Sequence, residues 1–289
     1  MAPVIVCGSN KGGAAKTTTA VNVAHGLAMR GLKVLIIDLD AQGNCSQLFG
    51  LLKNDVPLPP EVTVEPLFNG RASGATEAHG VHVVGWHPQS APYGQMLGDI
   101  DRLERFEDGL AETIAAIKPD VTFIDLPPTN QGFMGPTVLR YTTHLIAPLL
   151  SGPKELSGVR NVIRFAAALN KRYTTSIQTL GVVSYRSKTT NKVLLKMYED
   201  IDQEFGPLLF PHLPVSSVVT EAALMEQPVM VYEAACRDSD PKFGKYNERN
   251  WSFGRALMRV TEEVANRLSL ALPLPDPHPA PKAKVGAES

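Results

Sequence analysis

The chain has 289 residues, 44% hydrophobic and 20% charged, as in ordinary globular proteins. Its net charge of −1 excludes a molecule that is polycationic as a whole, but it leaves room for a local basic patch. The apolar runs fall short of the roughly 20 residues that span a bilayer. The N-terminus has no basic region of the secretory type, and the three scattered cysteines suggest neither a disulfide framework nor a metal knuckle. We therefore expect a cytoplasmic protein.

The first elements in the chain form a βαβ pattern. Residues 3–8 form a short β-branched run that ends in glycine, which predicts a buried strand. A helix is predicted from about 16 to 30, with Gly31 as its stop signal. A second apolar run at 33–38 predicts another strand. Strand, helix and strand in this order imply a parallel pair with a right-handed crossover.

The alternation of strand and helix continues downstream. Further strands are predicted at 81–86, 121–125, 144–148 and 177–184, and further helices at 101–117, 154–172, 190–205 and 248–270. Residues 53–80 are expected to be irregular, with a short helix at 64–68. The pattern predicts an α/β fold with one doubly wound, mostly parallel sheet and helices on both faces. We expect residues 1–272 to form a single domain and the proline-rich residues 273–289 to form a disordered tail.

A glycine-rich segment joins the first strand to the first helix. It runs Gly8-Ser-Asn-Lys-Gly-Gly-Ala-Ala-Lys-Thr-Thr18. In this context the backbone N–H groups turn inward around phosphate oxygens, and the helix N-terminus adds partial positive charge. Lys16 would reach the β- and γ-phosphates of a nucleotide, and the Thr17 hydroxyl would coordinate Mg²⁺. The alternative is a glycine-rich turn with a solvated lysine, which the flanking elements disfavour.

The segment departs from the strict GxxxxGK[ST] expression, because Asn10 and Ala15 stand at its two glycines. It resembles instead the deviant Walker A box, KGGxGKT[ST], of the ParA/MinD superfamily of P-loop ATPases. The resemblance implies an ATP site with Mg²⁺ in which Lys11 reaches across a dimer to the partner's nucleotide. It assigns nucleotide binding to Lys11, Gly12, Gly13, Ala14, Ala15, Lys16, Thr17 and Thr18.

Ala15 differs even from this box, where glycine is usual. A methyl group there would crowd the phosphate or the facing loop, or demand an unfavourable φ if the position is left-handed. We expect ATP binding to tolerate Ala15 better than fast hydrolysis or tight dimerisation does.

Two aspartates follow buried strands, where ligands of open α/β sheets gather. The segment from Asp38 to Asn44 resembles the family's DxDxQGN switch, which implies that Asp40 positions or activates the attacking water. The segment from Asp125 to Pro128 resembles its Walker B box, which implies that Asp125 holds Mg²⁺ through water. Taken singly, an aspartate after a strand is more often a helix cap or a turn residue than a catalytic or metal-binding one. The resemblance implies catalytic roles for Lys11, Lys16 and Asp40. It places Thr17, Asp40 and Asp125 at the metal.

The resemblance to ParA partition ATPases extends from residue 3 to about residue 270. Residues 180–191 are similar to the family's strand and "RTN" segment, and residues 213–229 to a stretch that approaches adenine, which implies that Pro214 contacts the base. The family implies an ATP-dependent homodimer that binds non-specific DNA, is nucleoid-associated, and is stimulated by a ParB-like adaptor.

Basic residues near the end of the chain are candidates for the DNA surface. Lys188, Lys192 and Lys196 recur every four residues, so on one helix they would share a face and follow phosphates without reading bases. Arg255 and Arg259 lie on the last predicted helix. The alternatives are a solvated helix face or ion pairs within the last helix.

Two other functions stay open. A membrane-cycling ATPase of the MinD type would need a basic amphipathic C-terminal helix, for which the proline-rich tail is poorly suited. A metabolic relative is the second alternative. The cysteines do not match an iron–sulfur protein, and the DLDAQGN segment disfavours an amide-forming ligase. The sequence favours a partition or positioning ATPase.

Overall fold

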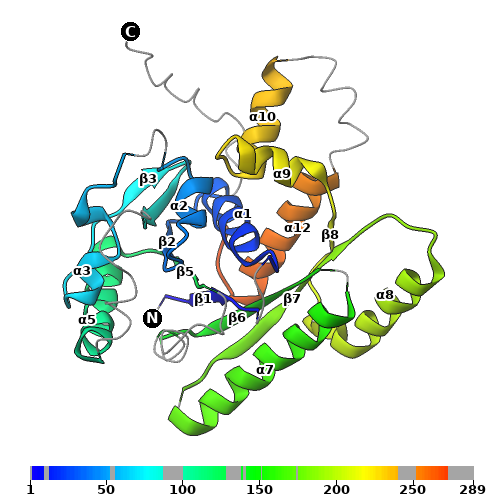
Figure 1. Ribbon diagram of the computed structural model, residues 1–289, viewed down its shortest axis with the longest axis horizontal. Coiled ribbons are helices and arrows are strands. Elements are labelled where there is room, and N and C mark those ends of the chain that lie inside the picture. Colours follow the sequence, from blue (N-terminus) through cyan, green and yellow to red (C-terminus); the bar gives the residue numbers. More distant parts are fainter. Residues whose placement is uncertain are drawn as a thin grey trace.

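The computed structural model describes residues 2–9, 13–52, 56–86, 100–127, 138, 141–150, 152–173, 175–239 and 252–272. Within these residues eight strands form one sheet in the order β3-β4-β2-β5-β1-β6-β7-β8 (Figure 1). They are β1 Val4–Cys7, β2 Val34–Asp38, β3 Thr76–Ala78, β4 Val81–Val84, β5 Val121–Asp125, β6 His144–Leu149, β7 Gln178–Arg186 and β8 Leu213–Pro214. Only β3 is antiparallel to its neighbour within this described sheet. The predicted α/β fold with a mostly parallel sheet is confirmed.

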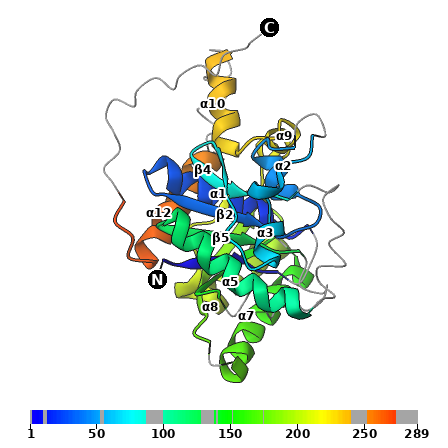
Figure 2. The ribbon, with the colours of Figure 1, turned by 90° about the vertical axis from the view of Figure 1, so that its left-hand side faces the viewer.

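Helices cover both faces of the sheet (Figures 1 and 2). One face carries α3 Glu65–Phe68, α5 Ile100–Ile117, α7 Pro153–Tyr173 and α8 Lys192–Phe205. The other carries α1 Lys16–Met29, α2 Asn44–Leu48, α9 Ser217–Leu224, α10 Val229–Ser239 and α12 Ser252–Arg267. Strand β1 shows how both cores form, because Val4 and Val6 face the first set of helices while Ile5 and Cys7 face the second. Among the helices that the structure describes, none has both the length and the apolar character to cross a bilayer.

Several short elements were not predicted from the sequence. The segment 53–80, expected to be irregular apart from one helix, also contains the 3₁₀ turn η2 at Pro60–Val62 and the edge strand β3. A second 3₁₀ turn, η3, spans Gly206–Leu208. Helix α9 begins at a recognisable cap, since the Ser216 hydroxyl accepts a hydrogen bond from the Val218 N–H at 3.3 Å. Elements of three to eight residues complete too few periods for a clear hydrophobic pattern. The predicted tail at 273–289 lies outside the described residues.

Helix α1 is buried almost all round, as expected for a helix enclosed by a sheet and other helices. The Asn22 side-chain oxygen accepts a hydrogen bond from the Val229 N–H at 2.8 Å, which ties α1 to the start of α10. Gly26 lies against Thr261 of α12, so closely that a Cβ at residue 26 would overlap the Thr261 hydroxyl. The helix that follows the glycine-rich loop is therefore fixed in place by close packing along its length.

This contact predicts that replacing glycine with alanine has opposite effects on stability at Gly26 and at Gly158. Gly26→Ala should lower the free energy of unfolding by about 1–2 kcal/mol, because overpacking outweighs the gain in helix propensity. Gly158→Ala in α7 is the matched control, since the nearest atom to its added Cβ is the Ser9 hydroxyl at 4.0 Å. It should raise stability by up to about 1 kcal/mol. Urea unfolding measures both, and equal effects would contradict the packing described for α1.

Candidate functional site

The glycine-rich loop leads from the end of β1 into the first turn of α1. Gly13 has a φ of 70°, and a Cβ there would meet no atom within 4 Å, so the backbone conformation alone favours glycine at this position. Ala15 stands just before α1 with φ 58° and ψ 24°, in the left-handed region. The unfavourable φ that the sequence raised as a possibility for Ala15 is therefore present. The predicted residues Lys11 and Gly12 lie outside the described part of the chain.

The N-terminus of α1 is open. As in any α-helix, its first amides have no carbonyl partner within the helix, and the N-cap residue Ala15 makes no side-chain cap. The helix dipole concentrates partial positive charge at this end. The amides near Lys16, Thr17 and Thr18 thus form a ready site for an anion.

Two carboxylates lie side by side at the carboxyl ends of neighbouring strands. Asp38 and Asp125 are register partners at the ends of the parallel strands β2 and β5, and both are fully buried. Asp38 accepts hydrogen bonds from the Ser46 N–H at 2.8 Å, the Ser46 hydroxyl at 2.7 Å and the Asp40 N–H at 3.1 Å. Burial nevertheless raises the pKa of Asp38 to about 7. Asp38 and Ser46 therefore hold the segment between them in its turn, a role that the sequence did not suggest.

Asp125 is less well satisfied than Asp38. Burial raises its pKa well above the ordinary value, and the charge of Asp38 raises it further, whereas the nearby Thr17 hydroxyl and the Lys16 charge lower it. Neither Asp125 oxygen makes a well-formed hydrogen bond within the described residues. A buried carboxylate without well-formed hydrogen bonds is costly unless a cation or a water molecule binds to it.

Lys16 lies close to two of the aspartates that the sequence singled out. The residue is only 6% exposed. Burial lowers its pKa, and the charges of Asp125 and Asp40 raise it. Asp40 is itself buried and turns the chain, since its side chain accepts a hydrogen bond from the Gln42 N–H at 3.0 Å. The structure thus brings Lys16, Asp40 and Asp125 together, while their roles remain predictions.

A cavity of about 860 Å³ opens in front of these residues. The loop and first turn of α1 contribute Gly13, Ala14, Ala15, Lys16, Thr17 and Thr18, and the segment after β2 contributes Asp40, Ala41, Gln42, Asn44, Gln47 and Leu48. Three residues of α9 that the sequence did not single out, Val219, Thr220 and Ala223, also line it. Pro214 is not among the described residues that line the cavity, so its contact with a base remains a prediction.

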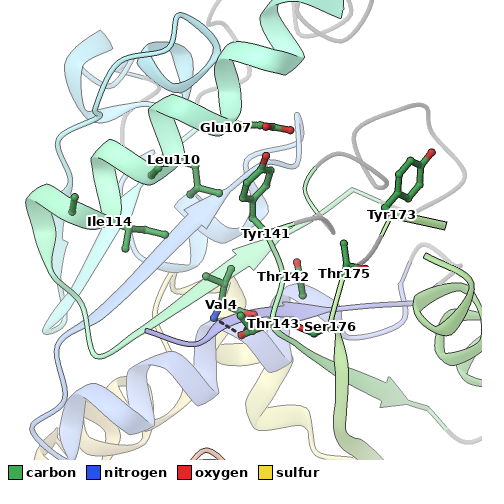
Figure 3. Close-up of a pocket in the computed structure, with 12 residues that line it drawn as sticks. Val4, Glu107, Leu110, Ile114, Tyr141, Thr142, Thr143, Tyr173, Thr175 and Ser176 are labelled. Carbon is green, nitrogen blue, oxygen red and sulfur yellow. Dashed lines mark hydrogen bonds between the residues drawn. The ribbon is translucent and has the colours of Figure 1, made fainter. Parts of the chain in front are cut away.

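A second cavity, of about 710 Å³, lies at the other end of the strands, where β1 begins (Figure 3). Leu110 and Ile114 of α5 and two tyrosines surround it. Two of its hydroxyls are bonded within the protein: Thr143 contacts the backbone of Val4, and Thr175 donates to the Asn170 side chain. Among the described residues that line it, Glu107 is the single carboxylate, and none belongs to the glycine-rich loop.

The predicted lysine stripe is partly wrong. Helix α8 begins at Lys192, after Asn191 caps it by accepting a hydrogen bond from the Val193 N–H at 2.9 Å, so Lys188 precedes the helix and shares no helical face with the others. Lys192 is exposed. Lys196 is exposed too, but its ammonium lies 3.0 Å from Asp200, which compensates its charge.

The arginines of α12 differ in role. Arg255 and Arg259 are exposed. Burial lowers the pKa of His212, and the charges of Arg186 and Arg259 lower it further, so both guanidinium groups lie near this imidazole. The nearby Asp202 raises the pKa of His212 and pairs with Arg186, so Arg259 is the cation of this group without a carboxylate partner among the ion pairs of the described residues. Arg267 instead donates to the carbonyls of Leu180, Leu208 and Leu209 and is structural.

Comparisons with known proteins agree with this geometry. The family model described as an AAA domain (AAA_31) matches residues 2–179. The chromosome partitioning protein ParA of Caulobacter vibrioides (strain NA1000 / CB15N) is 25% identical over 246 residues, which cover 82% of this chain and 89% of that protein.

Solved structures share the fold. The structure of pNOB8 ParA bound to nonspecific DNA has a TM-score of 0.62 and 20% identity, and the match covers 93% of this chain and 99% of that one. Cobyrinic acid a,c-diamide synthase from Mycobacterium smegmatis, with bound ADP and magnesium, has a TM-score of 0.62 and 23% identity over 82% of this chain and 95% of that one.

The matched family model spans more than half of the chain and contains the glycine-rich loop, both strand-end aspartates and the strands that carry them. The chain therefore belongs to this AAA domain family, as a ParA-type member of the ParA/MinD superfamily of P-loop ATPases.

Proposed function

We propose that this protein is a partition or positioning ATPase that binds ATP with Mg²⁺, dimerises with ATP bound, and binds DNA without sequence preference. The observation that carries the proposal is the uncapped N-terminus of α1, whose residues Lys16 and Thr17 lie close to the buried carboxylate of Asp125. An anion site and a cation site side by side suit a nucleoside triphosphate with its metal.

The residues present fit Mg·ATP. Mg²⁺ prefers oxygen ligands and keeps several waters, and the unsatisfied oxygens of Asp125 lie near the Thr17 hydroxyl. In the described part of the chain no three His, Cys, Asp or Glu side chains form a metal cluster by themselves, so phosphate oxygens and water would complete the coordination. Thr17, Asp125 and Asp40 would hold the ion, Lys16 would bind the phosphates, and Asp40 would orient the attacking water.

The dimer and the adaptor rest on the family resemblance. Lys11 would reach the partner's nucleotide, where a second cation neutralises charge that develops on the transferred phosphoryl group. A ParB-like adaptor would stimulate hydrolysis and release, and the protein would be cytoplasmic and nucleoid-associated. The curated relative from Caulobacter is a chromosome partitioning protein, which supports this reading.

DNA binding is proposed for exposed basic residues that follow β7 or lie on the outer face of α12. Lys188, Lys192, Arg255 and Arg259 would follow phosphates, whereas Lys196, already paired with Asp200, would contribute little. The solved pNOB8 ParA complex with nonspecific DNA shares this fold. A membrane-cycling function is the rival that an experiment must separate.

The function is tested with a labelled DNA duplex of arbitrary sequence and with anionic vesicles, each with Mg·ATP, Mg·ADP or no nucleotide. We expect DNA binding with Mg·ATP alone, falling steeply as salt rises because phosphate contacts release counterions. Lys192→Ala should weaken binding to all DNA sequences and reduce the slope of the logarithm of the binding constant against the logarithm of the salt concentration by about 1. Lys196→Ala should change the binding and this slope far less. Vesicle binding without DNA binding, or equal DNA binding in all nucleotide states, would refute the proposal.

A second prediction concerns the left-handed Ala15. Ala15→Gly should raise the free energy of unfolding by up to about 1 kcal/mol, because glycine adopts this conformation without steric cost. It should keep ATP binding and increase hydrolysis and dimerisation, since the methyl group no longer crowds the phosphates or the facing loop. Thermal unfolding, turnover and sedimentation velocity measure these effects.

Ala14→Gly is the matched control, because Ala14 has no positive φ. It should give no gain in stability and no rise in turnover. If Ala15→Gly and Ala14→Gly have the same stability and turnover, the left-handed backbone of Ala15 does not limit ATP hydrolysis or dimerisation.

A further inference from the structure

A chain of buried hydroxyl groups connects β7 with the glycine-rich loop. The Tyr185 hydroxyl lies 2.9 Å from the Thr19 hydroxyl, although the two residues are 166 positions apart in the sequence. The Thr19 hydroxyl donates to the Ala15 carbonyl at 2.7 Å, and the Thr19 N–H donates to the same carbonyl at 2.9 Å. Tyr185, Thr19 and Ala15 thus form one connected path that ends at the loop.

The direction of these hydrogen bonds follows from the acceptor at the end of the path. A carbonyl has no hydrogen, so the single hydroxyl hydrogen of Thr19 goes to Ala15 and Tyr185 must donate to Thr19. Both hydroxyl-bearing side chains are buried, with Thr19 1% and Tyr185 4% exposed. Burial raises the pKa of Tyr185, so the phenol keeps the proton that it donates.

The Ala15 carbonyl determines where the next amide points. In a trans peptide the C=O of Ala15 and the N–H of Lys16 point in opposite directions. When the carbonyl is held toward Thr19, along α1, the Lys16 N–H is aimed out of the helix end toward the cavity. An alanine with φ 58° keeps this orientation only while its surroundings enforce it.

We propose that Tyr185 is a positioning residue for the phosphate site, which acts through Thr19 to hold the Ala15–Lys16 peptide in its binding orientation. The inference rests on the proposed function, since it assumes that the loop binds the phosphates of ATP. It adds a residue from a strand outside the glycine-rich loop and both aspartate segments. The expected ligand of the positioned amide is a phosphate oxygen of the nucleotide.

The test compares Tyr185→Phe with Tyr198→Phe. Tyr198 is also buried and its hydroxyl also accepts a hydrogen bond, from the Ser187 N–H at 3.0 Å, but it packs on the opposite face of the sheet from Tyr185. Tyr185→Phe should raise the Kd for Mg·ATP about three- to tenfold, the effect of one hydrogen bond, and Tyr198→Phe should leave it unchanged. Thr19→Ser keeps the hydroxyl and should bind normally, whereas Thr19→Val should resemble Tyr185→Phe.

A second readout needs no nucleotide. In the free protein, the Thr19 amide should exchange with solvent about three- to tenfold faster in Tyr185→Phe, because the carbonyl that binds it is less well held. The loss of affinity in Tyr185→Phe should also shrink when Ala15 is replaced by glycine, which adopts the left-handed conformation without this support.

The outcomes separate the two proposals. If the unmodified protein binds Mg·ATP but Tyr185→Phe binds it equally well, with unchanged Thr19 exchange, the positioning role is wrong while the proposed function stands. If both tyrosine variants lose affinity equally, Tyr185 acts only on general stability and the positioning role is again wrong. If the unmodified protein binds no Mg·ATP, the proposed function fails and this inference fails with it.

Discussion

The pairing of β2 with β5 places two carboxylates, Asp38 and Asp125, next to each other in a region with no exposure to solvent. Charges buried in this way are costly unless hydrogen bonds or opposite charges compensate them. The fold meets this requirement for Asp38 through Ser46 and the Asp40 N–H. Asp125 lies near Lys16 and Thr17, but its carboxylate oxygens have no well-formed hydrogen bonds within the described residues. A cation bound there would compensate the buried charge.

Helix α1 carries the other half of the site and connects it with the rest of the molecule. Its first turn presents open amides, Thr19 contacts β7 through Tyr185, Asn22 contacts α10, and Gly26 contacts α12. A change in the loop therefore acts on a helix that is packed directly against α12, whose outer face carries Arg255 and Arg259. The helix of the proposed nucleotide site thus packs directly against the helix that carries two of the proposed DNA-binding arginines.

The sequence predicted the features that depend on local pattern. The strand–loop–helix unit around Lys16 and the strands that end at Asp38 and Asp125 have strong periodicity and clear turn signals, and parallel strands necessarily bring their ends together. Features that depend on distant contacts were missed. Tyr185 lies far from Thr19 in the chain, and α9 reaches the cavity only through tertiary packing. Lys188 was placed on a helix because the four-residue spacing was given more weight than the cap at Asn191.

The most direct test of the account is calorimetric titration of the protein with ATP, with and without Mg²⁺, near pH 7 in buffers of different ionisation enthalpy. We expect saturable binding of one nucleotide per chain that depends on Mg²⁺. We also expect release of protons, because a cation near Asp125 and Asp38 lowers pKa values that burial has raised. An absence of binding, or binding indifferent to Mg²⁺ and to the buffer, would contradict the claim that these carboxylates and the end of α1 form one nucleotide site.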